Sequence, residues 1–61
     1  MLIPKIVDYD ILICSGKRDI IIAVSNAIKR GWQPLGPVIK YNYDDYHQTM
    51  VKYEQPQINS I

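Results

Sequence analysis

Hydrophobic residues occupy alternate positions over residues 5–14, near the start of the chain. This two-residue period and the many β-branched side chains predict a strand over 5–14. One face begins polar, with Asp8 and Asp10, and becomes apolar at Leu12, so we expect it to be only partly covered. We expect the other face to pack in the core; it consists of Val7, Tyr9, Ile11 and Ile13.

A helical repeat follows this strand. Hydrophobic residues at spacings of three and four predict an amphipathic helix from about Lys17 to Arg30. Ser15 and Gly16 precede it, and a serine oxygen at this position can accept hydrogen bonds from the free N–H groups of the first turn. Gly31 is well placed as the left-handed residue that ends the helix. The predicted apolar stripe consists of Ile20, Ile21, Val24, Ala27 and Ile28.

A hairpin is predicted for the second half of the chain. Residues 32–41 form a strand whose prolines, Pro34 and Pro37, have no N–H to donate, so we place at least its first half at a sheet edge or bulge. Residues 42–45 have the composition of a turn. Residues 46–53 alternate again and close the hairpin as a third strand.

These elements predict an α+β fold of order β-α-β-β, with one helix packed on a three-stranded sheet. Residues 5–53 form the folded core of a single domain. Residues 54–61 are polar and broken by a proline, and we expect them to be a mobile tail or an arm that lies on a neighbour.

Self-association is predicted from the small size of the domain. A chain of 61 residues has a marginal core. Its one cysteine excludes an internal disulfide, and one cysteine with one histidine falls short of a structural zinc site. One helix also leaves one face of the sheet uncovered; we expect this face to carry Leu12 and Met50, while Ile22 lies away from the helix stripe. We therefore predict a homo-oligomer.

The composition argues against several classes of protein. The net charge of +1 is too small to indicate a nucleic-acid or membrane surface. No apolar run approaches the roughly 18 residues that a membrane span requires. We see no secretory signal at the start, and the free thiol of Cys14 favours a cytoplasmic protein.

Two motifs in the chain resemble a small family. The run Val24, Asn26, Ile28 and Gly31–Gly36 is followed by residues 46–52 with the sequence YHQTMVK. Together they resemble a domain-of-unknown-function family of bacteria and their phages, with a "GWxPxG" turn and a "QxMVK" strand. The resemblance covers about residues 9–52. By analogy of fold and size, it implies a phage anti-defence "sponge" that sequesters a nucleotide immune signal of the host, in a bacterial cell or phage-infected host.

Two groups of residues are candidates for binding a small anion. At the junction of strand and helix, free N–H groups, Gly16 and two cations suit a phosphate, although a capped helix with solvated cations is the more common arrangement. In the hairpin, aromatic rings lie beside cations and could stack a base, although tyrosines are also ordinary strand residues. The candidate ligand-binding residues are Ser15, Lys17, Arg18, Lys40, Tyr43, Tyr46 and His47.

Catalysis is not predicted. His47 has no serine, cysteine or carboxylate at a spacing that marks a catalytic partner. Asp8 and Asp10 share a strand face and could serve acid–base chemistry or bind a cation, but a solvated strand start explains them. We expect neither a cofactor nor a metal. The leading hypothesis is a non-enzymatic homo-oligomer that binds a small anionic ligand, such as a nucleotide. The alternative is a protein-interaction module or inhibitor that acts through its sheet edge or outer sheet face.

Overall fold

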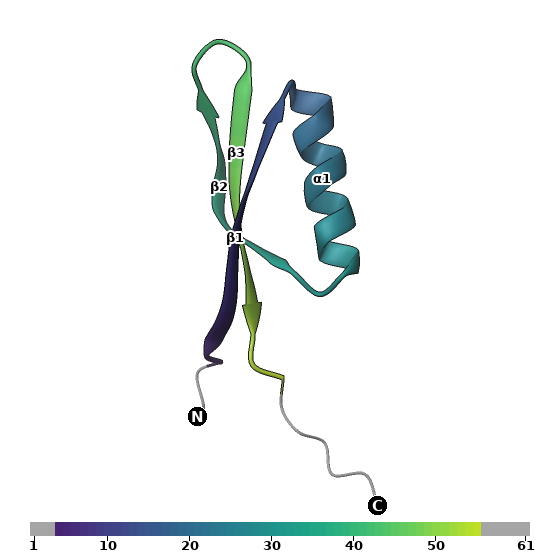
Figure 1. Cartoon of the computed structure of the whole chain (residues 1–61), viewed down its shortest axis with the longest axis vertical. Coiled ribbons are helices and arrows are strands. Elements are labelled where there is room, and N and C mark those ends of the chain that lie inside the picture. The colour runs from purple at the N-terminus through teal and green to yellow at the C-terminus, as the bar shows by residue number, and fades with distance from the viewer. Residues whose placement is uncertain (1–3, 56–61) are drawn as a thin grey trace, which may run out of the picture.

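The computed structural model describes residues 4–55. It consists of β1 (Ile6–Ser15), α1 (Lys17–Lys29), β2 (Gln33–Tyr41) and β3 (Asp45–Tyr53) (Figure 1). The predicted α+β fold, with one helix packed on a three-stranded antiparallel sheet, is confirmed. Of the predicted tail, only residues 54 and 55 are described; the Glu54 N–H donates to the Lys5 carbonyl (2.7 Å), and the rest lies outside the described residues.

The sheet has the strand order β1-β3-β2, with β3 antiparallel to both of its neighbours. The last strand therefore pairs on both sides, while β1 and β2 are the edges. The prolines of β2 lie at an edge, as their missing N–H groups predicted. In the sequence, α1 lies between β1 and β2. In the sheet, β3 lies between these two strands and pairs with both.

A bulge interrupts β2 opposite Gln48. Leu35 pairs with Thr49 and Ile39 with His47, so four steps along β2 match two steps along β3. Gly36 takes the positive φ of 78° that this bend requires. The buried Gln48 side chain donates from Nε2 to the carbonyls of Leu35 (3.4 Å) and Gly36 (3.1 Å), and to that of Thr49 (2.9 Å). Its amide thus ties the bulge to the central strand.

The two ends of α1 are built differently. At the C-terminal end, Gly31 has the predicted left-handed conformation (φ 96°). Its N–H donates to the Ile28 carbonyl and that of Trp32 to the Ala27 carbonyl, both at 3.0 Å, which is the Schellman pattern. The half-buried Trp32 ring lies 4.8 Å from the Lys52 ammonium, an arrangement that favours a cation–π contact.

At the N-terminal end of the helix, the prediction of a serine cap is wrong. Gly16, with φ 92°, is the N-cap, and no side chain caps the helix. Ser15 is the last residue of β1, and its Oγ donates to Asp45 Oδ1 (3.2 Å). The Gly16 N–H continues the β1–β3 ladder to the Asp44 carbonyl (2.8 Å). Strand pairing thus holds Ser15 in the sheet, one residue before the cap position.

The core lies between α1 and the sheet face that carries Leu12, Cys14, Gln48, Met50 and Lys52, which we call the helix-covered face. Leu12 pairs with Gln48 across β1 and β3. The Lys52 side chain reaches Gly31, just past the end of α1, and Met50, two residues before it, is fully buried. Residues two apart on a strand share a face, so this is the side on which the helix lies.

The expectation that Leu12 and Met50 lie on the uncovered face is therefore wrong. Met50 is fully buried, whereas Ile13 on the other face is 63% exposed. Both faces of β1 end in large apolar residues, so hydrophobicity alone does not select between them. The one-residue connection at Gly16 sets the direction in which the chain leaves β1, and this direction decides which face the helix covers.

The apolar stripe of α1 is also narrower than predicted. Ile20 and Ala27 are buried, and Ala23 and Val24 are half-buried. Ile21 and Ile28 are more than two-fifths exposed and lie outside the core, as does Ile22. A sheet contacts a helix along one side, so residues on the flanks of the apolar stripe remain exposed.

Candidate binding surfaces

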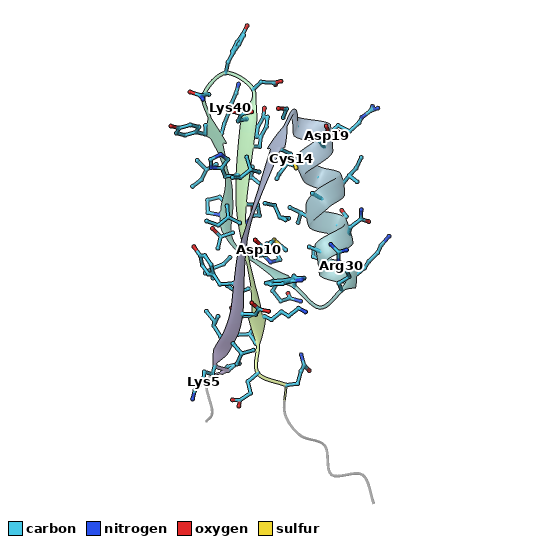
Figure 2. The ribbon with its side chains drawn as sticks, in the orientation of Figure 1. Lys5, Asp10, Cys14, Asp19, Arg30 and Lys40 are labelled. Carbon is cyan, nitrogen blue, oxygen red and sulfur yellow. The ribbon has the colours of Figure 1, made fainter. Side chains whose placement is uncertain are left out.

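The seven predicted ligand-binding residues lie near one end of the molecule, where the 42–44 turn meets the junction of β1 and α1. Hydrogen bonds from Gly16 to Asp44 and from Ser15 to Asp45 join these segments. Figure 2 shows Lys40 near the turn and Asp19 at the start of α1, at this same end. Tyr43 in the turn is 92% exposed.

These residues do not form one pocket, because they occupy both faces of the sheet. Lys40 pairs with Tyr46, which pairs with Cys14 on the helix-covered face. His47, the next residue, lies on the opposite face and stacks on the Tyr41 ring (centroids 5.2 Å apart, 24° between planes). Ser15 is also on that opposite face and is hydrogen-bonded to Asp45.

Charges at this turn end cancel. The three predicted cations, Lys17, Arg18 and Lys40, are accompanied by three carboxylates. Asp19 lies in the first turn of α1, where a negative charge already interacts with the positive end of the helix dipole. The other two carboxylates belong to Asp44 and Asp45. The turn end therefore has no excess positive charge to attract an anion.

An open pocket of about 510 Å³ lies on α1 itself, lined by Lys17, Arg18, Ile21 and Ile22. All four residues come from the first two turns of one helix. Within residues 4–55, no other helix or strand lines this pocket. Such a depression cannot surround a small ligand as binding pockets usually do.

The largest exposed apolar surface is the sheet face opposite α1. We call it the outer sheet face and define it by nine residues that alternate with those of the helix-covered face: Tyr9, Ile11, Ile13, Leu35, Ile39, Tyr41, His47, Thr49 and Val51.

The exposed part of this face comes from the two edge strands. On the central strand, Val51 is fully buried between its neighbours. On β1 and β2, Ile13 is 63% and Ile39 60% exposed. None of the nine residues is an acid, a lysine or an arginine, but Asp45 lies at the turn end of the same face, where it pairs with Ser15 and Tyr41 and carries a carboxylate. Sequence reasoning placed the β1 residues of this face in the core; their hydrophobic pattern was visible, but the side on which the helix packs was not.

The edge of β1 is closed by its own side chains. The Gly16 N–H points to β3, and N–H groups alternate sides along a strand, so those of Tyr9 and Ile11 point to the free edge. The Tyr9 N–H donates to Asp8 Oδ1 (2.9 Å) and the Ile11 N–H to Asp10 Oδ1 (2.8 Å). The two carboxylates thus occupy backbone donors that an added strand would need. Figure 1 shows α1 beside the second half of β1 only.

The edge of β2 is closed in another way. Pro34 and Pro37 have no N–H, and the bulge at Gly36 breaks the regular spacing of the ladder. Both edges are therefore poor sites for adding a strand, whereas the outer sheet face is open.

Within residues 4–55, no three histidine, cysteine, aspartate or glutamate side chains are grouped so that they could hold a metal ion. No helix in this part of the chain is both long and apolar enough to cross a membrane. No protein-family model, curated protein or solved structure matches this chain. The family resemblance of the "GWxPxG" and "QxMVK" motifs therefore stays a prediction.

Proposed function

We propose that this protein is a non-enzymatic binding protein whose contact surface is the outer sheet face. The observation that carries this proposal is the exposure of six large apolar side chains on one face of the sheet: Tyr9, Ile11, Ile13, Leu35, Ile39 and Tyr41. Monomeric soluble proteins rarely expose a contiguous apolar patch of this kind without using it in recognition.

The two edges favour the same surface. A partner that extended the sheet would need free backbone donors, but those of Tyr9 and Ile11 are bonded to Asp8 and Asp10. On β2, Pro34 and Pro37 have no backbone N–H to donate to an added strand. Of the two routes expected for a protein-interaction module, the face is therefore preferred over the edge.

The test compares two pairs of substitutions at exposed isoleucines. Ile13→Glu with Ile39→Glu places charges on the outer sheet face, and Ile21→Glu with Ile22→Glu places them on the exposed side of α1. Native mass spectrometry of protein purified from cells is expected to find the wild type bound to a protein partner, which can be a second copy. The partner should be lost in the first variant and kept in the second. A partner-free wild type, or a partner that survives the first pair, contradicts the proposal.

A second candidate function is the binding of a small anion, such as a nucleotide, at the turn end. It is favoured by two cations, Lys17 and Arg18, in the first turn of α1. The Gly16–Asp44 hydrogen bond joins this turn to the loop that carries the exposed Tyr43 ring, and cations beside a ring suit direct contacts to a phosphate and a stacked base. In an assembly of copies this site would act as a sponge for a nucleotide signal. Calorimetric titration with linear and cyclic nucleotides tests it: binding should weaken in Lys17→Ala with Arg18→Ala. The absence of heat with every nucleotide rejects it.

A further inference from the structure

We infer that the occupant of the outer sheet face is the same face of a second copy, and that the assembly closes at two copies. This inference rests on the proposed function, since it names the partner of the surface proposed there. It requires that the charges of the face are compatible with those of an identical face, that the face is large enough for a dimer, and that no other surface continues the assembly.

The charge of the face favours a second copy. None of its nine residues is charged, and their polar groups are the His47 ring, the Thr49 hydroxyl and the tyrosine hydroxyls. The carboxylate of Asp45 lies at the turn end of the face, where it accepts from Ser15 Oγ. A partner with charged residues would have to bury them against isoleucine in the middle of the face without a counter-charge, which is costly. A second copy presents the same uncharged middle.

The size of the face is sufficient for a small dimer. A sheet of three strands that lie about 4.8 Å apart, each about nine residues long with a rise of about 3.3 Å per residue, has a flat area of roughly 400 Å² per copy. Two such faces cover roughly 800 Å², which is below the value of about 1,200 Å² for stable specific interfaces, so we expect a weak dimer in equilibrium with the monomer. Two packed sheets about 10 Å apart would form a β-sandwich.

The anchors of this contact are aromatic and aliphatic side chains of the two edge strands. Tyr9 and Tyr41 lie at opposite corners of the face, because Tyr9 pairs with Val51 near one end of β3 and Tyr41 with Asp45 at the other. Ile13 and Ile39 flank His47 between these corners. Large side chains with few rotatable bonds are the usual hot spots of interfaces.

The other surfaces explain why the assembly stops at two. A face-to-face contact is isologous, so it uses up the same face on both copies. The opposite face is covered by α1, and the two edges are closed by Asp8 and Asp10 on β1 and by the prolines of β2. Extension of the sheet beyond the pair would need an edge-to-edge contact, which these groups oppose.

Sedimentation velocity and crosslinking test the dimer. In a Cys14→Ala background, Thr49→Cys near the middle of the face should be joined to its own copy by a short bismaleimide, whereas Ser25→Cys on exposed α1 should not. The wild type should sediment as monomer and dimer in a concentration-dependent ratio, and Ile13→Glu with Ile39→Glu should weaken the dimer at least tenfold.

The outcomes separate this inference from the proposed function. A wild type that stays monomeric at millimolar concentration, while the glutamate pair at Ile13 and Ile39 still abolishes binding of another protein, overturns the second copy and leaves the binding face standing. A wild type that forms trimers or larger species overturns closure at two. If the glutamate pair changes neither association nor binding, both proposals fail.

A separate experiment tests whether the free edge of β1 limits the assembly to two copies. Asp8→Ala with Asp10→Ala frees the Tyr9 and Ile11 N–H groups, and we expect species larger than the dimer in sedimentation. Asp44→Ala with Glu54→Ala, which also removes two exposed acids, is the matched control for the loss of charge and should leave the dimer unchanged. A purely dimeric Asp8 and Asp10 variant would show that these carboxylates do not limit the assembly.

Discussion

The two faces of the sheet are built from similar residues but have opposite surroundings. On the helix-covered face, Met50 is fully buried beneath α1, and the Lys52 side chain reaches the end of that helix. On the outer sheet face, Ile13 and Ile39 are about three-fifths exposed. An apolar side chain contributes to folding only when it leaves water. The first face therefore stabilises the monomer, and the second is available for recognition.

The largest effect is expected for the core between helix and sheet. Ile20→Ala removes a fully buried side chain of α1 and should lower the free energy of unfolding by about 2–5 kcal/mol. In a domain with a marginal core this would leave much of the protein unfolded. Urea unfolding followed by circular dichroism measures it. Ile22→Ala on the exposed side of the same helix is the control, and an equal loss there would contradict this division of α1.

A smaller loss is expected at Gln48, which is buried but polar. Gln48→Ala removes the Nε2 donor from the carbonyls of Leu35 and Gly36 in the bulge of β2. Leaving buried acceptors unpaired should cost about 1–3 kcal/mol. Hydrogen exchange should also become faster at β2 than at β1. Uniform acceleration in both strands would show that the amide does not act through the bulge.

Gly31→Ala should cost about 1 kcal/mol, because φ is 96° there and a side chain is strained in that conformation. A Cβ would meet only the Lys52 side chain, at 4.0 Å, so the cost comes from the backbone and not from a clash. Thermal unfolding measures the change. Asn at this position should be tolerated better than Ala, since Asn enters the left-handed region more readily, and the reverse order would refute this explanation.

The smallest effect on the monomer is expected at the outer sheet face. Ile13→Thr keeps a β-branched residue at an exposed position of β1 and should change the stability of the monomer by less than about 0.5 kcal/mol. Urea unfolding at low protein concentration, where association is negligible, measures it. A loss comparable to that of Ile20→Ala would mean that the two faces do not differ as described.

The fold was predictable where local chemistry decides it. The periods of two and four residues placed every strand and the helix to within one or two positions, and Gly31 marked the end of the helix correctly. The N-terminal cap was predicted wrongly, because pairing with β3 holds Ser15 in the sheet. The candidate ligand residues of the hairpin were predicted as one group, but Tyr46 and His47 are neighbours on β3 and therefore lie on opposite faces of the sheet.

Local sequence patterns determined where each strand and the helix lie, the missing N–H groups of the prolines placed β2 at an edge or bulge, and the presence of one helix left one face of the sheet without a cover. Only the tertiary structure decided which face this is, that β3 lies in the centre, and that Asp8 and Asp10 close the edge of β1. The physical reason is that helix and strand periods are properties of neighbouring residues, whereas the choice between two apolar faces depends on the path of the chain through Gly16 and on contacts between distant segments.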